Sequence, residues 1–290
     1  MRYKTVAAVL VVAVVLVTLT GCTRVDLREA DGVMQESVRL KGADSAEVDL
    51  RMGPGNLTIS GGGRGLMEGE FRYSDSSMEP EIDYRVDGDV GELDIRQGST
   101  LSGPFAWFGT WDGAYRNEWN LALGEEVPTD LRLELGAGNT ELNIGNTMVT
   151  ELNIETGAGN LDVDVTGSDT LEEFRLNAGA GDMTVVLASG RALRQLDVEA
   201  GAGNIRVDLS GDDWEEDIDA KIEAGVGDLT VILPSDVSVR VNVDTGVGEV
   251  KADDFVIDDG AYVNRAFGEG GPRIELDIDH GIGNVILRTD

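Results

Sequence analysis

The sequence predicts an all-β fold, a right-handed single-stranded β-helix (solenoid) with coils of about 22 residues behind an N-terminal β-rich cap region. One observation is a recurring Gly-x-Gly turn, whose first glycines are Gly136, Gly157, Gly179, Gly201, Gly225, Gly246 and Gly281. Their steps of 21, 22, 22, 24, 21 and 35 residues are typical of a solenoid. The other is the alternation of apolar and polar residues around each turn, which is typical of half-buried strands.

Residues 1–21 have the features of a secretion signal, with basic residues near the start and an apolar stretch at 6–19 that is too short for a comfortable transmembrane helix. The stretch ends in Leu19-Thr20-Gly21-Cys22, which resembles the bacterial lipoprotein box, in which the cysteine is acylated. Cys22 is the only cysteine, so it cannot form an internal disulfide and is a buried thiol, a reactive thiol or a lipidation site. Its position after the apolar stretch favours lipidation on the extracytoplasmic side of a membrane, and of the outer membrane in a Gram-negative cell.

Residues 22–36 are polar and predict a lipidated tether, so we expect ordered structure to begin at Ser37. An N-terminal β region follows at 37–130, with a first coil around a Gly-Pro-Gly-Asn turn. Short strands are expected there at 70–73, 81–86 and 92–95, separated by polar turns.

The same region contains an aromatic segment with three of the four tryptophans, Trp107, Trp111 and Trp119. Such a cluster can cap the open end of a solenoid or contribute to a local core. It can also form a platform on which sugars stack. We favour the cap or local core and keep the three tryptophans as possible ligand-binding residues.

The β-solenoid repeats occupy residues 131–290, with an insertion at roughly 253–272 before the last coil. No single coil can bury its apolar face alone, so stability should come from stacking. The residue after each second glycine is Asn or an acid, and such side chains should form a ladder along the stack. In sequence order Asp228 and Glu249 would be ladder neighbours about 5 Å apart. Such a pair is a solvated surface pair or a possible cation site.

The chain has 55 acidic and 23 basic residues, which gives a net charge of −32. Nucleic acid is therefore not an expected partner, because the phosphate backbone needs a positive surface. The composition fits a solvated acidic coat on an extracytoplasmic protein. Adaptation to a salty medium is a second interpretation, since salt screens the repulsion between carboxylates.

The sequence offers few groups for catalysis. His280 is the only histidine, and it directly precedes a turn, where it should cap or face solvent. The calcium-binding nonapeptide repeat has a different period, and no helix or lysine accompanies the Gly-x-Gly turns as in a phosphate loop. A polysaccharide lyase would need a convergent Arg or Lys base, which we do not find. We therefore expect no enzymatic activity, no cofactor and no confident metal site.

Three segments carry a resemblance to a known family: the repeated Gly-Ala-Gly-Asn/Asp unit, the stretch Leu66–Tyr73, and the stretch from Asn117 to Leu131. In these the chain resembles the toast-rack family of envelope proteins. That family resembles the C-terminal domains of cell-wall-active antibiotics response proteins and adhesin-like solenoids. The resemblance implies a β-helical, non-enzymatic envelope module, and it transfers no catalytic residues.

We therefore expect a lipid-anchored envelope solenoid that acts as a binding or scaffolding module, with a role in an envelope stress response. Its partners would be the membrane, through the anchor, and an envelope protein or glycan. The alternative is a glycan-binding, adhesin-like surface lipoprotein that uses the tryptophans. The oligomeric state is not predicted.

Overall fold

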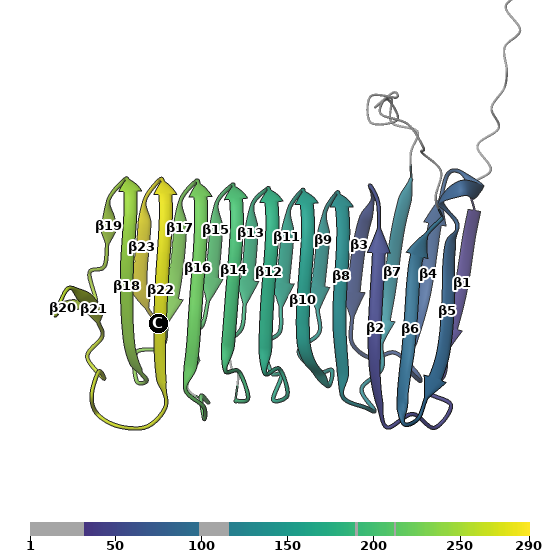
Figure 1. Ribbon diagram of the computed structural model, residues 1–290, viewed down its shortest axis with the longest axis horizontal. Coiled ribbons are helices and arrows are strands. Elements are labelled where there is room, and N and C mark those ends of the chain that lie inside the picture. Colours follow the sequence, from purple (N-terminus) through teal and green to yellow (C-terminus); the bar gives the residue numbers. More distant parts are fainter. Residues whose placement is uncertain (1–31, 99–115, 189–190, 212) are drawn as a thin grey trace, which may run out of the picture.

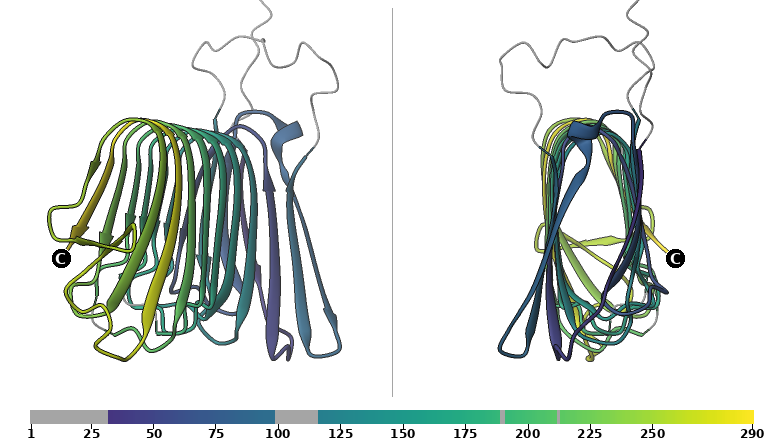
Figure 2. Two further views of the ribbon diagram at one scale, coloured as in Figure 1. Left: turned by 60° about the vertical axis from the view of Figure 1, so that its left-hand side comes forward. Right: turned by 90° about the vertical axis from the view of Figure 1, so that its right-hand side faces the viewer.

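The computed structural model describes residues 32–98, 116–188, 191–211 and 213–290, which form two long sheets facing each other (Figures 1 and 2). One sheet has 11 strands, and its spatial order is β1 (Gly32–Val38), β4 (Met67–Tyr73), β7 (Asn117–Leu123), β3 (Asn56–Ser60), β9 (Thr140–Asn143), β11 (Leu161–Asp164), β13 (Met183–Val186), β15 (Ile205–Asp208), β17 (Leu229–Leu233), β23 (Val285–Thr289) and β19 (Val250–Lys251).

The other sheet has 12 strands, in the order β20 (Val256–Asp258), β21 (Ala261–Val263), β18 (Ser238–Val247), β22 (Arg273–Ile282), β16 (Ile218–Val226), β14 (Gln195–Ala202), β12 (Glu173–Ala180), β10 (Val149–Ala158), β8 (Thr129–Ala137), β2 (Ser45–Met52), β6 (Val90–Gln97) and β5 (Pro80–Asp87). A short 3₁₀ turn, η1 (Ser76–Met78), precedes β5. Within the described ranges, no helix has the length and hydrophobicity needed to cross a bilayer.

Most neighbouring strands run parallel, and equivalent residues of successive coils lie side by side. Alternate side chains point inward, so apolar residues stack in rows between the two sheets. One such row runs through Leu133, Ile154, Leu176, Val198 and Ile222, all of them buried. The prediction of an all-β, solenoid-like fold is therefore confirmed.

The Gly-x-Gly turns lie at one edge, where the chain passes from the 12-stranded to the 11-stranded sheet (the upper edge in Figure 1). Here backbones approach too closely for a side chain. A Cβ atom on Gly181 would lie 1.9 Å from the carbonyl oxygen of Gly159, and the φ angle of Gly181 is +141°. A Cβ atom on Gly179 would lie 2.3 Å from the carbonyl oxygen of Gly157. Glycine is therefore required at both positions of the turn.

The predicted Asn and Asp ladder follows these corners. The Oδ1 atom of Asn204 accepts a hydrogen bond from the backbone N–H of Asp228 at 3.2 Å, and its Nδ2 atom donates to Asp182 at 3.1 Å. Along the ladder, bonded residues are separated by 21, 22, 22 and 24 positions in the chain. The ladder thus ties each coil to the next through backbone amides.

At the N-terminal end the array extends further than the sequence predicts. Strands β6 and β7 pair in parallel with β2 and β3, so they form one more coil outside the first one. Antiparallel strands then close this end, with β5 on β6 in one sheet, and with β4 on β7 and β1 on β4 in the other. The expected start of ordered structure at Ser37 is wrong, because Gly32–Val38 pair with β4 along their full length.

At the C-terminal end the last coil does not stack in sequence order. Strands β22 and β23 lie between the coil of β16 and β17 and the coil of β18 and β19. The insertion supplies β20 and β21, which pair antiparallel beyond β18. Both ends of the 12-stranded sheet therefore finish in antiparallel strands, which interrupt the parallel stack at its edges.

Candidate functional site

Trp119, one of the predicted ligand-binding residues, is part of the core. Its side chain is 0% exposed and packs edge-to-face against Phe71, with ring centroids 5.3 Å apart and an interplanar angle of 81°. The sequence predicts this placement, because Trp119, Leu121 and Leu123 occupy every second position of β7, and all three point inward. Trp119 is therefore not available to stack on a sugar. Trp107 and Trp111 lie outside the described residues, as does Cys22.

The prediction that Asp228 and Glu249 are neighbours in the ladder is wrong. Asn284 lies between them, because the last coil inserts between their two coils. The backbone N–H of Asn284 donates to Oδ1 of Asp228 at 2.9 Å, and the backbone N–H of Glu249 donates to Oδ1 of Asn284 at 3.4 Å. In the part of the chain that the structure describes, no three His, Cys, Asp or Glu residues cluster as a metal site would require.

Of the two roles predicted for His280, capping the turn or facing solvent, the second is wrong, because the side chain is 4% exposed and lies beneath the corners. Its Nε2 atom lies 2.8 Å from the carbonyl oxygen of Gly227 in the adjacent coil. Gly283 packs against its ring, since a Cβ atom there would lie 3.0 Å from the His280 ring. We therefore assign His280 to the packing of the corner.

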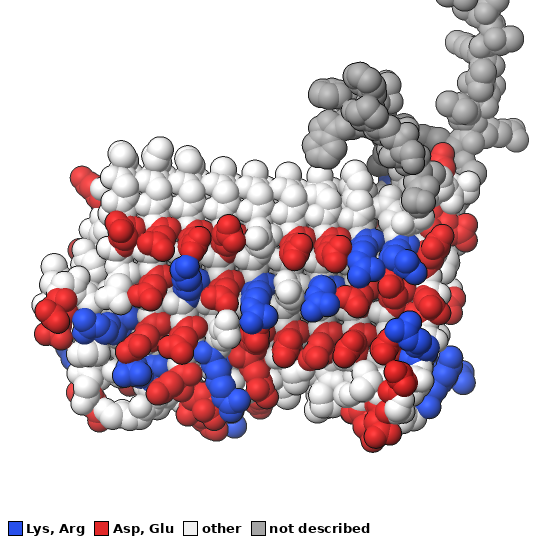
Figure 3. Space-filling view, in the orientation of Figure 1, with Lys and Arg blue, Asp and Glu red and all other residues white. Residues whose placement is uncertain are grey.

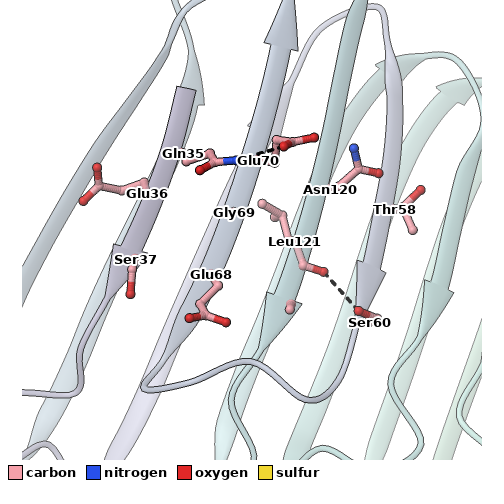
Figure 4. A pocket seen from close by; sticks show the side chains of 11 residues that line it. Gln35, Glu36, Ser37, Thr58, Ser60, Glu68, Gly69, Glu70, Asn120 and Leu121 are labelled. Atoms are coloured by element: carbon pink, nitrogen blue, oxygen red, sulfur yellow. Dashed lines mark hydrogen bonds between the residues drawn. The ribbon is translucent and has the colours of Figure 1, made fainter. Parts of the chain in front are cut away.

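A shallow open depression of about 490 Å³ lies on the outer face of the 11-stranded sheet, across β1, β4, β7 and β3 (Figure 4). Two rows of outward side chains line it. The first row runs through Gln35, Glu70, Asn120 and Thr58, and the second through Ser37, Glu68, Ala122 and Ser60. We call these residues the outer groove.

The outer groove is hollow because three of the four residues of its second row are small. Ser37, Ala122 and Ser60 have short side chains, so the sheet backbone forms the floor. Gly69 lies in the same floor and faces the core, where a Cβ atom would lie 2.8 Å from the ring of Phe71. The bulky Phe71 and Trp119 rings beneath hold this part of the sheet in place.

Glu70 is a fixed hydrogen-bond acceptor at the centre of the first row. Gln35 donates from Nε2 to Glu70 at 3.0 Å, and Arg72 donates from Nε at 2.8 Å. These two hydrogen bonds lower the pKa of Glu70, so the side chain is a carboxylate at neutral pH. The groove thus combines a carboxylate with amides and hydroxyls, a donor and acceptor set suited to a ligand rich in hydroxyl or amide groups.

The outer face of the 12-stranded sheet has a different character, because it carries rows of charge (Figure 3). Equivalent positions on neighbouring strands form a run of four carboxylates, Glu47, Asp130, Glu151 and Glu173. Burial and the charges of Asp130 and Glu173 raise the pKa of Glu151. A second run nearer the corners contains Glu199, Glu223, Asp279 and Asp244.

Basic side chains between these runs neutralise part of the charge. Arg175 pairs with Glu173 and Asp197, and Lys221 pairs with Glu223. Exposed pairs of this kind contribute little stability individually. The 12-stranded face remains acidic, so it should repel polyanions and accommodate basic or neutral partners.

The outer groove was not predicted, because its residues come from four strands spread over residues 32–123. Gln35 was assigned to the tether, and the pairing of β1 with β4 depends on contacts far apart in the chain. The local signal was the set of small or polar residues at outward positions of β3 and β7, Thr58, Ser60, Asn120 and Ala122.

Comparison with known proteins gives one family. Residues 28–186 and 170–232 match the family described as the N-terminal domain of toast_rack, DUF2154. No curated protein is significantly similar to the chain.

Several solved structures are similar to the chain. A proposed cell adhesion protein from Clostridium sporogenes is 28% identical, with a TM-score of 0.49, and the match covers 90% of this chain and 100% of that one. A proposed adhesin from Bacteroides fragilis is 10% identical, with a TM-score of 0.25, over 89% of this chain and 98% of that one. A proposed lipid binding protein from Parabacteroides distasonis is 10% identical, with a TM-score of 0.29, over 90% and 96%.

Proposed function

Because the chain belongs to the toast-rack family, we propose that it is a non-enzymatic binding or scaffolding module of the cell envelope. Lipid on Cys22 holds the module at the extracytoplasmic side of a membrane, and the solenoid displays its two outer faces. The lipoprotein-like sequence Leu19-Thr20-Gly21-Cys22 supports the anchor. Two or three acyl chains give stable attachment, whereas a single chain gives only reversible binding.

The outer groove is the observation that carries the binding role. Its carboxylate, amides and hydroxyls are spaced by the strands, about 4.8 Å apart, on a rigid sheet. A rigid surface of this kind loses little conformational entropy when a partner binds. We therefore assign the outer groove to the recognition of an envelope partner.

A glycan is the second candidate ligand, because sugars present many hydroxyl groups and Glu70, Asn120 and Thr58 can bond them. This adhesin-like role would not use Trp119, which is buried. It depends on the polar groups of the groove instead.

We further propose that the coils are right-handed and single-stranded, with a length of about 22 residues. The right-handed connection is the usual one between parallel strands. A crystal structure would test the handedness. A role in an envelope stress response belongs to the same proposal, and loss of the protein should then change survival under cell-wall antibiotics.

Site-specific crosslinking in intact cells tests the binding role. A photoreactive amino acid at Asn120 in the groove should capture a defined partner, whereas the same group at Asp162 should not. Asp162 is the matched control, because it is exposed on β11 of the same sheet. A protein adduct supports scaffolding, and a carbohydrate adduct supports the glycan-binding role. Equal capture at both positions, or none at either, contradicts the assignment of the groove.

A further inference from the structure

The Gly-x-Gly corners form an edge whose crest is uncharged and apolar. The middle residues of the corners lie in one row, which we call the corner edge. In spatial order they are Pro54, Ala137, Ala158, Ala180, Ala202, Val226, Ile282 and Val247. Figure 3 shows this edge as an uncharged band above the rows of charged side chains.

Three residues at one end of the corner edge expose large aliphatic side chains. Val226, Ile282 and Val247 lie on neighbouring strands and are 51%, 53% and 66% exposed. The turn geometry does not require these larger side chains, because four other corners of the row have alanine at the same position. Their side chains gain little packing within the molecule. A contiguous row of exposed aliphatic residues is typical of a contact surface.

The chain outside the structure joins the fold at the other end of the same edge. Gly32, the first described residue, pairs with Tyr73, and Tyr73 pairs with Asn117. The Nδ2 atom of Asn117 donates to the carbonyl oxygen of Pro54 in the corner edge at 2.8 Å. Cys22 therefore connects to the corner edge through about ten residues, which can span at most about 35 Å.

We propose that the corner edge lies on the membrane that holds the lipid anchor, with Val226, Ile282 and Val247 inserted among the lipid headgroups. This inference rests on the proposed anchoring at Cys22. The solenoid would be held at both ends, by lipid near Pro54 and by aliphatic side chains at the far end. Its two sheets would stand up from the bilayer and leave the outer groove open to the side.

The charge distribution limits the contact to the crest of the corner edge. The chain carries a net charge of −32, and on the face seen in Figure 3 most carboxylates lie below the uncharged crest of the corner edge. An anionic bilayer repels these carboxylates, and the repulsion decays within about 10 Å. Carboxylates flank the exposed aliphatic row on both sides. Glu223, Asp279 and Asp244 lie on the 12-stranded face, and the exposed Asp228 and Glu249 follow Val226 and Val247 in the ladder. Contact at the corner edge is therefore shallow and limited to its apolar crest.

Fluorescence quenching in vesicles tests the orientation. The full lipidated protein would carry a single added cysteine, labelled with an environment-sensitive dye, because lipid blocks the thiol of Cys22. The vesicles would contain phosphatidylethanolamine, phosphatidylglycerol and a lipid with a nitroxide at the headgroup. A dye at Val247→Cys should be quenched at least about threefold more than a dye at Asp236→Cys, since interfacial apolar groups enter about 5–10 Å into the headgroup region. Asp236 is the control, because it is exposed in the turn after β17, at the opposite edge.

A triple variant adds an independent readout. Val226→Ala, Ile282→Ala and Val247→Ala give these corners the residue present at the other coils, so the fold should persist. A dye at Ala202→Cys should then lose most of its quenching while the protein still sediments with the vesicles. Equal quenching at positions 247 and 236 overturns the membrane contact and leaves the anchor intact. A protein that is not lipidated, and does not sediment, overturns the anchor and with it this inference.

Discussion

Replacing Gly181 with alanine should destabilise the protein by about 4 kcal/mol. Two costs add up. The φ angle of +141° is rarely adopted by an L-residue, which costs about 1–3 kcal/mol. The new Cβ atom would lie 1.9 Å from the carbonyl oxygen of Gly159, and forcing the coils apart costs about another 1–3 kcal/mol. Urea unfolding followed by circular dichroism should show a midpoint lower by about 1 M or more.

Two control variants separate these costs. In Gly179→Ala the clash remains, with a Cβ atom 2.3 Å from the carbonyl oxygen of Gly157, but the φ angle is not positive. In Gly88→Ala the φ angle of +62° remains, and no atom lies within 4 Å of the new Cβ. Each should cost less than Gly181→Ala, with Gly88→Ala at about 1 kcal/mol. If Gly181→Ala costs no more than Gly88→Ala, the coils do not stack through their corners as described.

Three further predictions concern the ladder, the acidic face and the net charge. Asn204→Ala leaves the backbone N–H of Asp228 without its side-chain acceptor and should cost about 1 kcal/mol in urea unfolding, and an unchanged midpoint would contradict the ladder. Burial and neighbouring carboxylates raise the pKa of Glu151, so the folded state binds its proton more tightly and gains stability as the pH falls through the raised pKa. Glu151→Gln should therefore stabilise the protein by about 0.5 kcal/mol at pH 7, and by nothing below about pH 3, where Glu151 is protonated in both the folded and the unfolded state. Sodium chloride should raise the melting temperature, because it screens the repulsion of a chain with a net charge of −32, and a melting temperature indifferent to salt would contradict this.

The strands and corners of the fold are predictable because their signals are local. Alternation places Leu176 inward whatever its neighbours are, and close backbone approach requires glycine at Gly181 in any stack of coils. The stacking order is not local. Val250 and Val285 both suit the position beside Leu229, since every coil presents the same pattern. The sequence therefore could not place Asn284 between Asp228 and Glu249.

The candidate site was less predictable than the fold. The outer groove depends on the pairing of Gln35 with Glu70 and of Glu70 with Asn120, across strands far apart in the chain. The position of Trp119, by contrast, was predictable from local sequence. Trp119, Leu121 and Leu123 occupy every second position of β7, which marks Trp119 as a core residue. Its aromatic character allowed a sugar-binding platform as the alternative to a cap or local core, and the period-two pattern already favoured the core.

Mass spectrometry of the N-terminal peptide tests the proposed envelope anchoring most directly. The protein purified from membranes should begin at Cys22 and carry acyl groups on it, and Cys22→Ser should appear in the soluble fraction. An unmodified Cys22 in the membrane-bound protein, or a Cys22→Ser variant that still sediments with membranes, would contradict the anchor.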